Sequence, residues 1–123
     1  MRPRALPNPG WLPSAAYPDA YPSAGRYAQV LGRATAEVDT VRVTVDGNTR
    51  TVPVINGTFA AGLALTGTNV VSVLLVRAIS RTGETISEWD GPPRRCAVDP
   101  AGTVVVGRGN EDPASCVRAR PWK

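Results

Sequence analysis

The chain has 123 residues, enough for one domain with a hydrophobic core and too few for two ordinary domains. Glycine and proline number 12 each, a content that is high for a helical protein and normal for a loop-rich β protein. The formal net charge is +4. This modest excess comes from scattered arginines, so it bears on solubility and gives no support to nucleic-acid binding.

The residue types that usually carry catalysis are missing. The chain contains no histidine, which removes the commonest general base, triad partner and metal ligand. No serine lies in a Gly-x-Ser-x-Gly elbow, and no glycine-rich phosphate loop precedes a helix. The loop Gly109–Asp112 lacks the acidic density of a dedicated calcium site. We therefore expect no enzymatic activity, no cofactor and no metal ion.

Residues 1–26 are rich in proline and in aromatic residues. Proline at this density excludes a helix and favours extended polyproline geometry. Aromatic rings with a polar tip are typical of contact surfaces. We interpret the segment as an extended arm that docks on a partner or back on its own domain, with a solvated linker as the alternative. The residues expected to contact a partner are Trp11, Tyr17, Tyr21 and Tyr27.

The body of the domain is predicted to begin near Tyr27, with a first strand over residues 27–35. Val41, Val43 and Val45 then alternate with polar residues. This period of two is typical of a strand that is buried on one face.

Two tight turns are predicted after that strand. Asp46-Gly47-Asn48 accepts the positive φ angles of a hairpin turn, and Asn56-Gly57 has the same chemistry. Residues 52–54 continue the strand pattern between the two turns, although Pro53 lacks a ladder donor. The proline predicts an edge strand or a bulge.

The second turn leads into the most apolar part of the chain. Residues 59–65 alternate again, and a turn over residues 66–69 leads to residues 70–78. Apolar residues occupy both faces of this last run, as a central covered strand requires. A turn over residues 81–84 and a short strand over residues 85–89 follow.

The C-terminal residues contain both cysteines. Cys96 and Cys116 flank a predicted strand over residues 103–106, which follows a turn over residues 99–102, and residues 116–118 form a last short strand. We expect a disulfide that fastens the tail to the domain, with a loop-closure contribution of about 3 kcal/mol. Two reduced thiols are the alternative. A disulfide indicates an oxidising compartment.

About seven or eight short strands, with turn signals at the spacing of a sandwich, predict an all-β fold. The segment over about residues 27–87 resembles bacterial immunoglobulin-like domains, including those found beside glycosidase catalytic domains and in surface or phage proteins. The resemblance implies an immunoglobulin-like antiparallel β-sandwich. It rests on turn and strand motifs in a fixed order: Val30-Leu31-Gly32, Val41-x-Val43-x-Val45-Asp46-Gly47, Asn56-Gly57-Thr58-Phe59, Leu65-Thr66-Gly67-Thr68-Asn69 and Gly83.

These observations divide the chain into a docking arm over residues 1–26, a sandwich core over residues 27–91 and a C-terminal extension over residues 92–123. We expect a non-enzymatic structural or docking module of a larger assembly, such as a phage virion or a bacterial surface structure. The alternative is a secreted accessory domain that binds protein or carbohydrate, with sugar rings stacking on exposed Trp11, Trp89 or Trp122.

The expected partner is a capsid, tail or surface protein, in a multi-copy assembly or as a homo-oligomer, and neither nucleic acid nor a membrane. Residues 1–30 hold no apolar stretch of a secretory signal, and the longest apolar run is far short of the ~20 residues that cross a bilayer. We expect the protein in a virion or at a cell surface.

Overall fold

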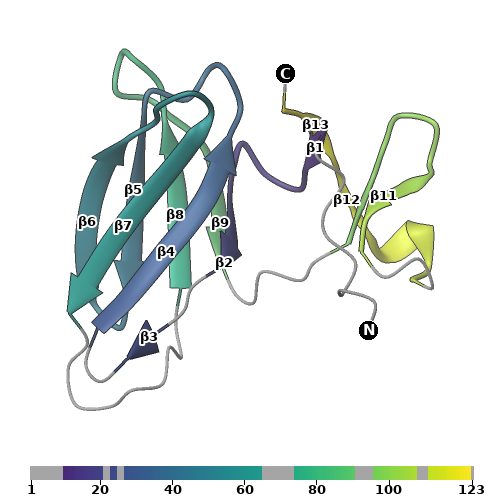
Figure 1. Cartoon of the computed structure of the whole chain (residues 1–123). Helices are drawn as coiled ribbons and strands as arrows, with labels where there is room; N and C mark the ends of the chain where they lie inside the picture. The colour runs from purple at the N-terminus through teal and green to yellow at the C-terminus, as the bar shows by residue number, and fades with distance from the viewer. Residues whose placement is uncertain are drawn as a thin grey trace.

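A computed structural model describes residues 10–20, 23–24, 27–64, 74–90, 96–107 and 111–122. The described chain is all-β apart from one 3-10 turn, and two of its sheets face each other as a sandwich (Figure 1). Tyr21, the predicted turn over residues 66–69 and the first part of the predicted strand over residues 70–78 lie outside the described residues.

The front sheet is built around β4 (Tyr27–Ala34), which is hydrogen-bonded on both sides. β7 (Thr58–Ala64) pairs with one side of it, while β2 (Ala16–Ala20) and the short β3 (Ser23–Ala24) share the other side. All of these pairs are antiparallel.

The second sheet has the order β6-β5-β8-β9 and is also antiparallel. Its strands are β5 (Thr40–Val45), β6 (Asn48–Pro53), β8 (Leu74–Ile79) and β9 (Thr85–Asp90). The predicted antiparallel β-sandwich is therefore confirmed, and β8 has the central position expected for the most apolar strand.

The core lies between the two sheets and follows the period of two. Val41, Val43 and Val45 of β5 are fully buried, as are Val30 of β4 and Val76 of β8. Each such side chain stabilises the fold by about 1.5–3 kcal/mol relative to an exposed one. The alternation predicted over residues 41–45 thus places one face of β5 in the core.

The Asp-Gly and Asn-Gly turns form as predicted, but they play different roles. Asp46 and Gly47 have φ angles of 49° and 86° and join the paired strands β5 and β6. Asn56 and Gly57 have φ angles of 54° and 76°, yet β6 and β7 belong to different sheets. The second turn is closed by an antiparallel bridge between Ile55 and Thr58, but the pairing goes no further, and the chain passes from one sheet to the other.

The sandwich is held together along the seam between β6 and β7 by side chains. Asn48 Nδ2 donates to the carbonyl of Ala64, and Arg50 Nη1 donates to the carbonyl of Gly62 at 3.3 Å. These bonds satisfy carbonyls on the outer edge of β7, where no further strand is paired among the described residues. Pro53, at the end of β6, lies on an edge strand, as its missing donor predicts.

The proline-aromatic segment is extended, as predicted, and its described part belongs to the folded body. β2 pairs with β4 from Ala16 opposite Ala34 to Ala20 opposite Leu31. Tyr17 is 1% exposed, and its ring meets Trp89 edge to face with 4.9 Å between centroids. The boundary predicted between the arm and the sandwich core, at residues 26 and 27, therefore lies between β3 and β4 of the same sheet.

The C-terminal residues 96–122 form a small second unit, which we call the cysteine module. Its sheet has the order β11-β10-β12, from β10 (Ala97–Val98), β11 (Val104–Val106) and β12 (Val117–Arg118). A 3-10 turn, η1 (Pro113–Ser115), precedes β12. In the part of the module that the structure describes, the buried cluster consists of Ala97, Val106 and Ala119.

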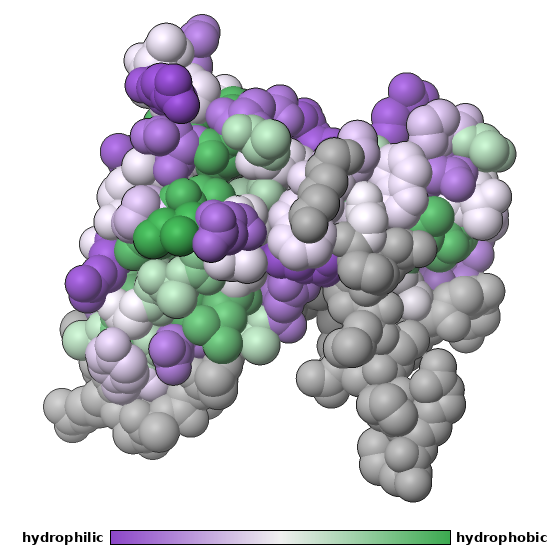
Figure 2. All heavy atoms as spheres, turned by 45° about the horizontal axis from the view of Figure 1, so that its top comes forward, coloured by the Kyte–Doolittle hydropathy of each residue, from purple (hydrophilic) through white to green (hydrophobic). Residues whose placement is uncertain are grey.

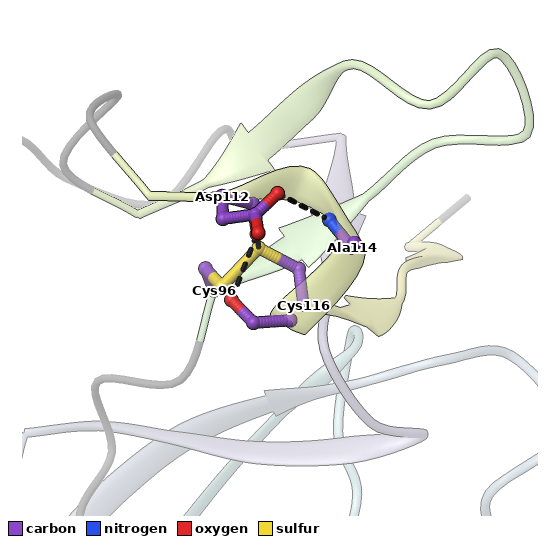
Figure 3. The surroundings of a disulfide bond; sticks show 5 residues. Cys96, Asp112, Ala114 and Cys116 are labelled. Atoms are coloured by element: carbon purple, nitrogen blue, oxygen red, sulfur yellow. Dashed lines mark hydrogen bonds between the residues drawn. A yellow bond between two sulfur atoms is a disulfide. The ribbon is translucent and has the colours of Figure 1, made fainter.

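The predicted disulfide between Cys96 and Cys116 is present, with an S–S distance of 2.12 Å (Figure 3). Each cysteine comes immediately before one strand of the parallel pair β10–β12, in which Ala97 lies opposite Val117. The backbone N–H of Val117 donates to the carbonyl of Cys96 at 3.1 Å. The disulfide thus fixes the register of two strands that are 20 residues apart in sequence.

A two-stranded ladder joins the cysteine module to the sandwich. β1 (Trp11–Leu12) pairs antiparallel with β13 (Arg120–Pro121). Leu12 is fully buried in the core of the sandwich, whereas Trp11 packs on the small cluster of the module. Adjacent residues of β1 therefore belong to two different hydrophobic clusters and hold them together.

Candidate docking site

The outer face of the front sheet carries large side chains on β4 and small ones on β7. In the antiparallel pair of β4 and β7, Tyr27 lies opposite Ala64, and Leu31 lies opposite Ala60. Tyr27 leans over Gly62, where a Cβ atom would collide with its hydroxyl group. The ring of Tyr27 therefore covers β7 at Gly62.

This face gathers the exposed large hydrophobic residues of the described chain. They are Tyr27, Leu31 and Ile55, which are 53%, 37% and 62% exposed. Figure 2 shows hydrophobic residues collected on the sandwich, on the side where β4 and β7 face the viewer in Figure 1. Single exposed hydrophobic residues are ordinary, but Leu31 and Ile55 line the same pocket, and neighbouring exposed hydrophobic residues are typical of interaction surfaces.

A groove of about 510 Å³ runs across this face. It is lined by residues of β4 and β7, by residues at and after the end of β6, and by Asp19 of β2. The lining residues are Asp19, Leu31, Gly32, Arg33, Val52, Pro53, Ile55, Thr58, Phe59 and Ala60.

The ion pair at the β2 end of the groove is bidentate. Arg33 Nε donates to one carboxylate oxygen of Asp19 at 2.8 Å, and Arg33 Nη2 donates to the other at 2.9 Å. Arg33 is only 9% exposed, so its guanidinium group is largely removed from water. The parallel pair of hydrogen bonds fixes the plane of the guanidinium group.

The side chain of Trp122 packs against the guanidinium group of Arg33. The guanidinium carbon of Arg33 lies 5.1 Å from the ring centroid, within cation–π range. Trp122 Nε1 also donates to the carbonyl of Gly57 at 3.1 Å. A Cβ atom at position 57 would lie 2.9 Å from Nε1, so glycine permits this close approach. We call the surface made by Arg33 and Gly57 the tryptophan seat.

The structure brings together only part of the set of residues predicted to contact a partner. Tyr27 is exposed on the β4 face, while Trp11 is partly buried on the cysteine module. The prediction that Tyr17 contacts a partner is wrong. Because β2 pairs with β4, the ring of Tyr17 lies in the core and packs on Trp89. Tyr21 lies outside the described residues.

The tryptophans do not form an exposed platform for sugar rings. Trp89 is 3% exposed in the core, which corrects the expectation that it is available for stacking. Trp11 and Trp122 are partly buried against the two hydrophobic clusters. The surface-exposed groups of the groove are mainly aliphatic.

Sequence reasoning missed the principal residues of the groove. Leu31 lies in the strand motif Val30-Leu31-Gly32, and Ile55 directly precedes the turn at Asn56-Gly57. Neither position has a local pattern that marks it as a contact residue. The available signal was the run of small residues over 60–64 opposite the bulky residues of the first strand. That signal becomes readable only when the register of β4 and β7 is known.

Comparisons with known proteins give no independent identification: no protein-family model matches the chain, and no curated protein matches it. Among the described residues, no group of three or more His, Cys, Asp or Glu is arranged to hold a metal ion. A search of the same residues finds no helix that is long and apolar enough to span a membrane.

Proposed function

We propose that this protein is a non-enzymatic docking module whose outer β4–β7 face binds a protein partner. The observation that carries the proposal is the position of Tyr27, Leu31 and Ile55, which are exposed on one face of the sandwich. Burial of exposed aliphatic and aromatic side chains supplies the main driving force of protein association. A groove bounded by a fixed ion pair adds the polar contacts that orient a partner.

The proposal includes an immunoglobulin-like assignment of the sandwich. Labelled in chain order from β2, the front sheet reads A-B-E and the second sheet reads C′-C-F-G. Immunoglobulin domains place A, B and E on one sheet and C, F and G on the other, and variable-type domains add C′ beside C. The resemblance over residues 27–87 supports the same assignment.

A protein ligand suits this face better than a carbohydrate does. The sugar-binding surface considered from the sequence needs exposed tryptophans, whereas Trp89 is buried and Trp11 and Trp122 are partly buried. The exposed ring on this face is the single side chain of Tyr27. Leu31, Ile55 and Pro53 offer aliphatic surface instead. Such surface complements the apolar side chains at the centre of a protein interface.

The disulfide supports a location in an oxidising environment. A docking module in a virion or a bacterial surface structure meets this condition. The disulfide and the β-sandwich also suit a component that must stay folded outside the cell.

The test is site-specific photo-crosslinking in cells that produce the protein. A benzophenone-bearing residue replaces Leu31 in one variant and Thr51, exposed on the second sheet, in the control. We expect a discrete adduct from position 31, none from position 51, and loss of the first adduct when Ile55→Asp is added. Equal crosslinking from both positions, or an adduct insensitive to Ile55→Asp, would contradict the proposal.

A further inference from the structure

The tryptophan seat has the chemistry of a recognition site that is already filled. It offers a cation to the ring face, a carbonyl to the indole N–H and a position without a Cβ atom where the ring edge approaches. The group that fills it is a side chain of the same chain, 65 residues away from Gly57 in sequence. An arginine above an aromatic ring is a common feature of protein–protein contacts.

We propose that the seat of Arg33 and Gly57 is the aromatic subsite of the docking groove, and that Trp122 is an internal occupant that a partner's tryptophan side chain displaces. This inference rests on the proposed docking function and names the chemistry of the partner. Arg33 lines the groove and also faces Trp122, so one guanidinium group connects the groove to the seat.

The seat stays formed when Trp122 leaves it. Arg33 is held by two hydrogen bonds to Asp19, which do not involve Trp122. Gly57 is held in a turn closed by two backbone bonds between Ile55 and Thr58, of 2.9 and 3.0 Å. A preorganised site loses little conformational entropy when a new ligand enters. A partner therefore finds the subsite in its binding geometry.

Apart from Trp122 itself, which packs on the core of the sandwich, the tail is held by a short ladder and an exposed ion pair. β13 contains two residues, and its partner strand β1 is equally short. Arg120 approaches Glu37 at 3.9 Å, but both side chains are substantially exposed, and exposed ion pairs contribute little. Undocking of this tail breaks no sheet of the sandwich.

The subsite is predicted to prefer tryptophan to phenylalanine. Tryptophan combines the most favourable ring for a cation with an N–H group that donates to the Gly57 carbonyl. Phenylalanine offers the ring alone, and the Gly57 carbonyl then keeps one hydrogen bond, from the Ala34 N–H at 2.9 Å, and lacks the second. An aliphatic side chain lacks both contacts.

The experiment uses the full chain and N-acetyl-L-tryptophanamide as the probe. The Trp122→Ala variant empties the seat, and ¹H–¹⁵N spectra follow the amides of residues 55–58 and the Nε–H of Arg33 during titration. We expect shifts at these groups in Trp122→Ala and binding at least about tenfold weaker in the wild-type protein, where Trp122 competes. Trp11→Ala is the matched control, since it removes a tryptophan outside the seat.

Two further measurements distinguish specific recognition of tryptophan from nonspecific filling of the cavity left by Trp122→Ala. N-acetyl-L-leucinamide should bind Trp122→Ala at least about tenfold more weakly than the tryptophan probe. Adding Gly57→Ala to Trp122→Ala places a methyl group in the seat and should weaken binding of the tryptophan probe. Equal binding of both probes, or equal probe affinity of wild type and Trp122→Ala, would overturn the inference.

The outcomes also distinguish the two proposals. Crosslinking from position 31 together with a failed probe titration rejects the aromatic subsite and leaves the docking face intact. A successful titration without crosslinking rejects the docking function and leaves a seat that recognises only the protein's own tail.

Discussion

The sandwich and the cysteine module reach an ordered state by different means. Among the described residues, the buried cluster of the sandwich contains 19 residues from both sheets and from the N-terminal segment, whereas that of the module contains three. Two of the three are alanines, which bury little apolar area. Hydrophobic burial therefore suffices for the sandwich, while the module depends on its disulfide and on docking to its neighbour.

The small hydrophobic cluster of the cysteine module explains why the disulfide lies in the module and not in the sandwich. A disulfide stabilises most where folding alone provides little, because it removes freedom from the unfolded chain. Cys96 and Cys116 bracket the long connection of a parallel strand pair, the type of pairing that cannot be closed by a tight turn. The sandwich uses tight antiparallel turns instead and contains no cysteine.

Removal of a core ring from the sandwich is expected to have the largest effect. Tyr17→Ala deletes a fully buried aromatic side chain that packs edge to face on Trp89, and should lower the free energy of unfolding by about 3–5 kcal/mol. Urea denaturation measures this loss. Tyr27→Ala is the matched control on the exposed face and should cost less than about 1 kcal/mol. Similar losses in the two variants would contradict the assignment of residues 11–20 to the core.

Loss of the disulfide should have a smaller and more local effect. The double variant Cys96→Ser/Cys116→Ser is expected to lose about 2–4 kcal/mol of protection in the module. Hydrogen exchange should accelerate at Val117 and Ala119 and stay unchanged in the central strands β4, β5 and β8. Reduction of the wild-type protein with dithiothreitol should reproduce the pattern. Uniform acceleration across both parts would show that the module and the sandwich fold as one cooperative unit.

The smallest effect is expected for the ion pair between the two parts. Glu37→Gln removes the partner of Arg120, and both side chains are largely exposed, so the change in stability should stay below about 0.5 kcal/mol. The melting temperature in low and high salt checks this value. A larger loss would mean that charge, in addition to the β1–β13 ladder, holds the module in place.

The sequence was most informative where one face of a strand is buried. Strands over residues 27–35, 41–45 and 85–89 and the turns at Gly47 and Gly83 agree with the structure, because a period of two and positive φ angles are local properties. The turn at Asn56-Gly57 also forms as predicted, but its flanking strands separate after the single bridge between Ile55 and Thr58. Turn chemistry specifies the turn, while tertiary packing decides whether its flanking strands share a sheet.

Residues 11–20 were the hardest part to predict. Pro13 and Pro18 argue locally against a central strand, and the two alanines before Tyr17 give no strong apolar period. The structure accommodates Pro18 because β2 is an edge strand with an irregular register between Pro18 and Ala20. The docking site was equally hidden, since Arg33, Gly57 and Trp122 meet only through tertiary contacts.

The β1–β13 ladder also determines how the protein responds to mechanical tension. The N–H of Trp122 donates to the carbonyl of Gly10 at 2.9 Å, so the two ends of the described chain leave the fold at one point. Because the two strands run antiparallel from that point, a pull on both ends opens their bonds one after another. Trp122 leaves its seat at this first step, before any strand of the sandwich is loaded. On further extension the disulfide bears the load, so the chain between Cys96 and Cys116 cannot be stretched.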